Sequence, residues 1–111
     1  MKEYEYYIYS PSGNDTVLVL KEIRNNITRK EISEKVMRLN PDVEQVGFIS
    51  TDKKKLTMAG QEFCGNGARC AIYEYLNGKE GEIDIEVSGC DSILHGGIVG
   101  KNVYLEYPHC S

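Results

Sequence analysis

The chain has 111 residues, 41% of them hydrophobic and 27% charged, and its 17 acidic and 13 basic side chains give a formal charge of −4. This length suits a single domain over residues 1–111, and the interspersed charges give no reason to expect nucleic acid or an anionic membrane as a partner. No apolar run is long enough to span a bilayer, and residues 1–5 contain no apolar secretion segment, so we expect a cytoplasmic protein.

The first half of the chain predicts two strands followed by a helix. Residues 4–9 and 16–20 are rich in aromatic and β-branched side chains, and the turn residues of segment 11–15 separate them. Thr28 and Glu31 have the spacing of a capping box, with Ile27 and Ile32 as a hydrophobic staple, so we expect the helix to begin at Thr28. It should end at residues 40–41, with an apolar stripe at 32, 36 and 39. The charged residues left to water would be Arg29, Lys30, Glu34, Lys35 and Arg38.

The second half predicts more strands around one short helix. Residues 43–50 and 55–58 favour two strands joined by a charged turn, and a helix is expected from about Gly67 to Leu76. Apolar and charged residues alternate over 83–87, which is typical of a half-buried strand, and residues 92–99 and 103–107 predict two further strands.

Cys64 lies where the second helix is expected to begin, directly before Gly65, Asn66 and Gly67. The unpaired N–H groups and the positive dipole end at such a position stabilise a thiolate. They also bind a carboxylate or phosphate, which can come close because glycine has no Cβ atom. A lone cysteine is more often a small buried hydrophobe and Gly-Asn-Gly more often a plain loop, but their combination with Arg69 favours a chemical site.

The four cysteines do not have the paired short spacing of common zinc ligands, so we expect no metal site. Cys70 falls inside the predicted helix and is expected to pack in the core.

The segment 64–70, Cys-Gly-Asn-Gly-Ala-Arg-Cys, resembles the first catalytic motif of the diaminopimelate epimerase family, the cofactor-independent amino-acid racemases and epimerases. Residues 12–17, Ser-Gly-Asn-Asp-Thr-Val, resemble the turn after that family's first strand. The resemblance covers the N-terminal lobe of a two-lobed protein. It implies an α+β fold of mostly antiparallel strands wrapped around a central helix, and an isomerase that needs no pyridoxal phosphate or other cofactor. In it, Cys64 would be one of two thiol acid/base groups, and the substrate contacts would be Asn14, Gln45, Gly65 and Asn66.

The substrate is left open by the segment before this motif. Residues 57–62, Thr-Met-Ala-Gly-Gln-Glu, depart from the Asn-Ala-Asp-Gly-Ser-Glu type of segment usual in diaminopimelate epimerases and look closer to the histidine racemases of metallophore biosynthesis. The expected substrate is therefore diaminopimelate, as in lysine biosynthesis, or histidine. A non-catalytic amino-acid-binding module is the alternative.

Inversion of an α-carbon needs an acid and a base on opposite faces, and a thiol and a thiolate can fill these roles. In the resembling enzymes the second thiol comes from the other lobe, and this chain has no second motif of that kind; Cys90 precedes a strand pattern rather than a helix. Besides a small amino-acid substrate, the expected partner is thus a second lobe. It would come from a longer chain, from a separate protein, or from a homodimer mate that brings another Cys64.

Overall fold

The computed structural model describes residues 6–9, 15–91 and 93–106, so the predicted substrate contact Asn14 lies outside the described residues. Along this part of the chain the elements are β1 (Tyr6–Tyr9), β2 (Asp15–Val19), α1 (Asn26–Leu39), β3 (Val43–Ile49), β4 (Lys55–Met58), α2 (Gly65–Tyr75), β5 (Gly81–Val87), β6 (Leu94–Val99) and β7 (Asn102–Leu105). Neither helix in these ranges has the length and hydrophobicity needed to cross a membrane.

The strands form one mixed sheet in chain order, from β1 to β7. The pairs β1–β2, β3–β4, β5–β6 and β6–β7 are antiparallel, whereas β2–β3 and β4–β5 are parallel. A helix connects each parallel pair, because the chain must return to the same end of the sheet before the next strand begins. The α+β fold expected from the sequence is confirmed, and the two parallel pairs are an addition to it.

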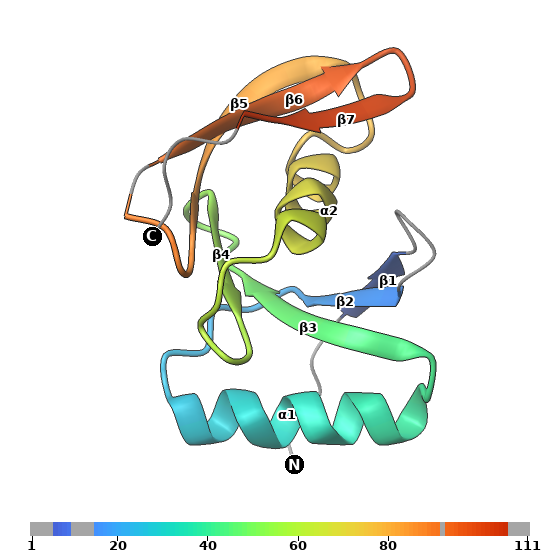
Figure 1. Cartoon of the computed structure of the whole chain (residues 1–111), viewed down its shortest axis with the longest axis vertical. Helices are drawn as coiled ribbons and strands as arrows, with labels where there is room; N and C mark the ends of the chain where they lie inside the picture. Colours follow the sequence, from blue (N-terminus) through green and yellow to red (C-terminus); the bar gives the residue numbers. More distant parts are fainter. Residues whose placement is uncertain (1–5, 10–14, 92, 107–111) are drawn as a thin grey trace.

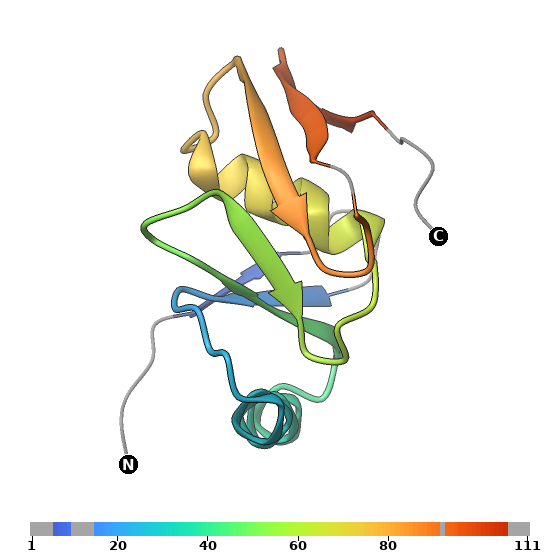
Figure 2. The same ribbon diagram turned by 90° about the vertical axis from the view of Figure 1, so that its left-hand side faces the viewer.

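The sheet curls around α2, with β1–β3 on one side of this helix and β5–β7 on the other (Figure 1). The helix α1 lies on the outer side of β1–β3 and does not share this enclosure (Figure 2). Ala68, Ala71 and Ile72 of α2 are fully buried in a core that includes Leu18 from β2 and Leu94 from β6. A helix as short as α2 is marginal in water by itself, so burial between the two halves of the sheet stabilises it.

The helix α1 begins earlier than its sequence pattern predicts. Its N-cap is Asn25, whose Oδ1 accepts hydrogen bonds from the backbone N–H groups of Ile27 at 2.8 Å and Thr28 at 3.1 Å. The predicted capping box at Thr28 is therefore wrong, and Ile27 is 69% exposed rather than part of a staple. Asparagine caps a helix at least as well as threonine, so the earlier of two competing caps adds most of a turn.

The buried face of α1 also differs from the prediction. Arg29, Ser33 and Val36 are the buried residues, a row at spacing i, i+4 and i+7, while Leu39 is 67% exposed. Arg29 is only 3% exposed, and its Nη1 donates a hydrogen bond to the carbonyl of Ile23, just before the helix. The expectation that Arg29 faces water is thus wrong, because the face of α1 that carries Arg29 packs against β3 and buries the guanidinium as well.

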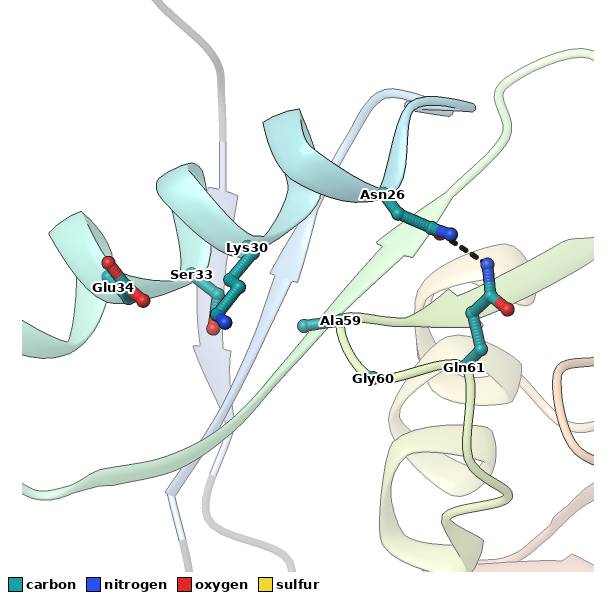
Figure 3. Close-up of a pocket in the computed structure, with 7 residues that line it drawn as sticks. All are labelled: Asn26, Lys30, Ser33, Glu34, Ala59, Gly60 and Gln61. Carbon is teal, nitrogen blue, oxygen red and sulfur yellow. Dashed lines mark hydrogen bonds between the residues drawn. The ribbon is translucent and has the colours of Figure 1, made fainter.

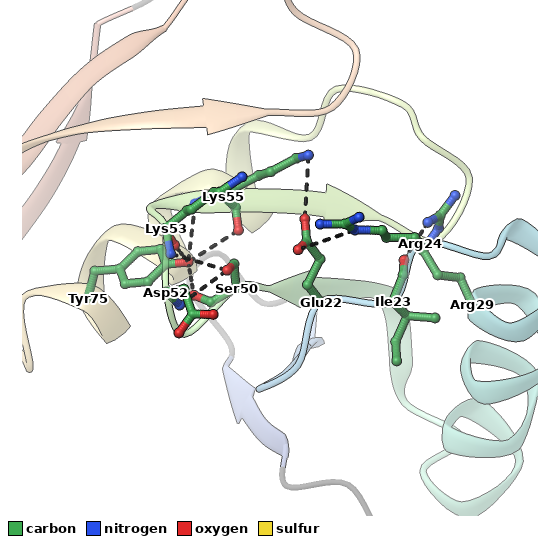
Figure 4. A network of polar contacts seen from close by, with 9 residues as sticks. All are labelled: Glu22, Ile23, Arg24, Arg29, Ser50, Asp52, Lys53, Lys55 and Tyr75. Carbon is green, nitrogen blue, oxygen red and sulfur yellow. Dashed lines mark hydrogen bonds and ion pairs between the residues drawn. The ribbon is translucent and has the colours of Figure 1, made fainter.

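The hydroxyl of Tyr75, in the last turn of α2, holds the connection between β3 and β4 (Figure 4). It lies 2.6 Å from the carbonyl of Ser50 and 2.9 Å from that of Lys53, and it accepts a hydrogen bond from the backbone N–H of Lys55 at 3.2 Å. Burial raises the pKa of Tyr75, so the hydroxyl keeps its proton for these carbonyls. The exposed, charged turn is therefore fixed against the end of the central helix.

Candidate active site

Cys64 is the N-cap residue of α2, as its sequence context predicts. Its backbone is extended, with φ −136° and ψ 111°, and its Sγ accepts a hydrogen bond from the backbone N–H of Gly67 at 3.3 Å. The side chain is half-buried and carries a free thiol. The helix begins at Gly65, two residues before the predicted start, because the cysteine sulfur satisfies an N–H group of the first turn.

Gln45 is brought to Cys64 by the sheet. The Cys64 thiol donates a hydrogen bond to Gln45 Oε1 at 3.0 Å, although the two residues are 19 positions apart. The same oxygen accepts a hydrogen bond at 3.2 Å from the hydroxyl of Thr16, which is fully buried in β2. Thr16 and Gln45 are partners in the parallel β2–β3 pair, so the register of these strands places them side by side.

Thr16 is a site residue that sequence reasoning did not single out. The only available signal was a hydroxyl at the start of an otherwise apolar run, and such a residue commonly just begins a strand.

Gly65 and Asn66 form the first turn of α2, next to the sulfur of Cys64. Their backbone N–H groups have no hydrogen-bond partner among the described residues, whereas that of Gly67 is taken by Cys64. The Asn66 side chain accepts a hydrogen bond from Arg69 Nη1 at 3.1 Å, which holds it beside the turn. Two N–H groups at a helix N-terminus are therefore available for an anion.

Gly67 has a packing role instead of a binding role. A Cβ atom at this position would lie 2.8 Å from the Sδ atom of Met58. The missing side chain lets α2 approach β4, while the two N–H groups that have no partner among the described residues belong to the two preceding residues.

Cys70 lies on the buried side of α2 and packs in the core, as predicted. Burial, together with the neighbouring Cys64, raises the pKa of Cys70 to about 12, although the Thr16 hydroxyl acts in the opposite direction. At neutral pH this sulfur therefore stays protonated and is not suited to proton exchange with a substrate.

The loop before Cys64 is held by the turn after β5. The Ser88 hydroxyl donates a hydrogen bond to the carbonyl of Glu62 at 2.7 Å and accepts one from the backbone N–H of Met58 at 2.9 Å. At Gly89, with φ +77°, a Cβ atom would lie 2.2 Å from the backbone nitrogen of Phe63. These contacts between the loop and the turn were not predicted, since nothing in segments 58–63 and 88–89 indicates that they meet.

A separate open pocket of about 500 Å³ lies between α1 and the loop after β4 (Figure 3). Asn26 and Gln61 hydrogen-bond to each other at one end of it. It is lined by Asn26, Lys30, Ser33, Glu34, Ala59, Gly60 and Gln61. None of the predicted site residues in the described part of the chain lines it, so this pocket is distinct from the surroundings of Cys64.

Comparison with known proteins identifies related sequences. A family model described as the N-terminal domain of the histidine racemase CntK matches residues 3–107. A histidine racemase of Staphylococcus aureus is 29% identical over 99 residues, which cover 81% of this chain and 36% of the relative. A histidine racemase of Fusobacterium nucleatum is 41% identical over 61 residues, covering 54% of this chain and 22% of the relative.

The matched segments span about a third of the first relative's length and about a fifth of the second's. The family model, in contrast, extends over nearly the whole of this chain. The chain therefore belongs to the family of histidine racemase N-terminal domains.

Proposed function

We propose that this chain is the N-terminal lobe of an amino-acid racemase that works without pyridoxal phosphate, with Cys64 exchanging a proton with the substrate α-carbon. The observation that carries the proposal is the pair of opposite hydrogen bonds at the Cys64 sulfur. Sγ donates its proton to Gln45 Oε1 at 3.0 Å and accepts the Gly67 N–H at 3.3 Å. The protonated and ionised forms each have a partner, which suits a group that must alternate between acid and base.

The substrate carboxylate binds at the N-terminus of α2 in this proposal. The N–H groups of Gly65 and Asn66 have no partner in the described part of the chain and point out of the first helical turn. Together with the helix dipole they attract a carboxylate, and they stabilise the negative charge that spreads onto it when the α-proton leaves. Gln45 supplies a further contact from β3, and Asn14 stays a predicted one.

Histidine is the substrate that we propose. Both relatives are named histidine racemases, and this favours histidine over diaminopimelate and the lysine pathway. A free thiol at position 64 must stay reduced in order to act, which is consistent with a cytoplasmic protein.

A second lobe completes the site in this proposal. Of the two cysteines with free thiols in the described residues, Cys70 is buried and only Cys64 is placed for acid/base work. The chain spans about a third of the first relative's length, which supports a second acid/base group on another segment of a longer protein. A separate protein or a second copy of this chain are the other sources.

The test is solvent deuterium incorporation at the α-carbon of L- and D-histidine, with diaminopimelate stereoisomers for comparison. We expect the wild-type chain to exchange the α-proton of histidine, and the exchange to fall by roughly 100-fold or more in Cys64→Ala. Cys70→Ala is the matched control and should keep the exchange, because that sulfur only packs. Exchange with inversion would indicate a complete site with two acid/base groups. Exchange without inversion would indicate a site with only the group of this lobe.

A binding measurement separates loss of chemistry from loss of the site. Titration of histidine into the ¹⁵N-labelled chain should shift the backbone amide signals of Gly65 and Asn66 more than those of α1. A folded chain with no exchange and no shifts at these two residues would contradict the proposal.

A further inference from the structure

The orientation of the Gln45 side chain decides which form of Cys64 it stabilises. An amide accepts hydrogen bonds at its oxygen and donates them at its nitrogen. The oxygen faces the sulfur here, at 3.0 Å, and a carbonyl that accepts the S–H proton favours the neutral thiol. If the amide were turned over, Nε2 would donate to the sulfur and would favour the thiolate. In the observed orientation Nε2 has no hydrogen-bond partner among the residues that the structure describes.

Thr16 is in a position to choose between these two orientations. Its hydroxyl is fully buried and lies 3.2 Å from the same Gln45 oxygen. The hydroxyl has one proton, which it donates to Gln45. That proton requires an acceptor, which is Oε1 and not Nε2.

We propose that Thr16 is a positioning residue that fixes the Gln45 amide with its oxygen toward Cys64, so that Cys64 rests as the proton-donating thiol and Gln45 Nε2 faces the ligand carboxylate. The role of this amide orientation in racemisation rests on the function proposed above. The protonation of Cys64 does not depend on that function, because it can be measured without any substrate.

The experiment is the rate of Cys64 alkylation by iodoacetamide between about pH 6 and pH 10, with peptide mass spectrometry to separate Cys64 from the other cysteines. The variants are Thr16→Val, which keeps the shape and removes the hydroxyl, and Thr16→Ser, which restores it. Gln45→Leu serves as the reference in which the acceptor is absent. In Thr16→Val the Gln45 amide is free to turn over. We therefore expect the pH midpoint of Cys64 alkylation to move downwards in this variant.

The expected increase in the alkylation rate follows from the loss of one hydrogen bond. Alkylation at pH 7 should rise by roughly 3- to 10-fold in Thr16→Val, in the same direction as in Gln45→Leu, while Thr16→Ser should match the wild type. A midpoint that moves in Gln45→Leu but not in Thr16→Val would overturn the role of Thr16. Unchanged profiles in both variants would overturn the role of the amide oxygen as well.

A second measurement covers the case in which Thr16→Val does not fold, which rapid alkylation of the buried Cys70 would reveal. In the wild-type chain, the Gln45 side-chain amide protons should give no nuclear Overhauser contact to the β protons of Cys64. Strong contacts between them would mean that the amide nitrogen faces the sulfur, contrary to the proposal. An alkylation profile that shifts in Thr16→Val, combined with no deuterium exchange of histidine, would support this inference and count against the proposed function. The inference and the proposed function can therefore fail separately.

Discussion

At the scale of single residues, the Cys64 sulfur is subject to two opposing contacts. The Gly67 N–H stabilises negative charge on it, whereas the Gln45 oxygen holds its proton. Hydrogen bonds of this kind each contribute about 0.5–1.5 kcal/mol net, so the loss of either contact should measurably change the reactivity of the sulfur. The helix N-terminus alone, which is what the sequence reveals, would have predicted only the first of the two effects.

His95 is a second residue whose charge the structure controls, on the exposed face of β5 and β6. Its Nδ1 lies 2.7 Å from an Asp84 carboxylate oxygen and its Nε2 lies 3.0 Å from one of Glu82. These hydrogen bonds, that of Asp84 first and that of Glu82 second, raise the pKa of His95. Carboxylates on both ring nitrogens require both to donate, so the imidazolium is the form that fits.

We predict that His95 stabilises the fold at acidic pH and not at alkaline pH. Because the pKa is raised on folding, the stabilisation is fully present below about pH 6.5, the usual pKa of a histidine, and is lost as the pH rises through the folded value. The melting temperature of the wild type should therefore exceed that of His95→Gln near pH 6, with the difference shrinking towards pH 9. A difference that stays constant over this range would argue against the charged pair.

At the scale of elements, the turn after β5 keeps the Cys64 loop in place. Ser88 bonds both ends of that loop, and Gly89 touches its backbone. Strands β5 and β4 are parallel neighbours, which is why a turn so distant in sequence reaches the loop.

Gly89→Ala tests the contact between the turn after β5 and the Cys64 loop, and Gly100→Ala is its matched control. Both glycines have positive φ, +77° and +61°, but a Cβ atom at Gly100 would meet nothing within 4 Å. The backbone strain, about 1–2 kcal/mol, is therefore common to both variants. We expect Gly89→Ala to lose at least about 1–3 kcal/mol more in urea unfolding, since it must also displace the Phe63 backbone, and to change the alkylation rate of Cys64. Equal losses and unchanged alkylation would mean that the contact is unimportant.

At the scale of the whole molecule, α2 connects the two halves of the curled sheet. It packs against β2 and β3 on one side and against β6 and β7 on the other. Ile72 is completely buried, in a core that holds residues from both halves, including Leu18 of β2 and Leu94 of β6. Removal of its side chain should therefore loosen both halves together rather than one of them.

We expect Ile72→Ala to cost about 2–5 kcal/mol of unfolding free energy, the usual range for such a truncation in a core. Hydrogen exchange should accelerate equally in β2 and in β6, which lie on opposite sides of α2. Ile27→Ala is the control, because Ile27 is exposed and should change stability by no more than about 0.5 kcal/mol. Faster exchange in one strand alone would indicate that the halves unfold independently.

The order of strands and helices and the place of Cys64 could be read from the sequence by itself. Alternation over residues 83–87 and the Gly-Asn-Gly start of α2 depend on neighbours within a few positions, and so their signals are local. Even the misplaced start of α1 was a local matter, since Asn25 and Thr28 are both good caps and the pattern alone did not favour the right one.

Only the tertiary structure decided which side chains meet. Thr16 and Gln45 are 29 positions apart, and Ser88 and Glu62 are 26 apart, and both contacts depend on the parallel pairs β2–β3 and β4–β5. Burial of Arg29 likewise depends on how α1 lies against the sheet. A shift of one residue in the register of β2 would turn Thr16 to the other face of the sheet and away from Gln45.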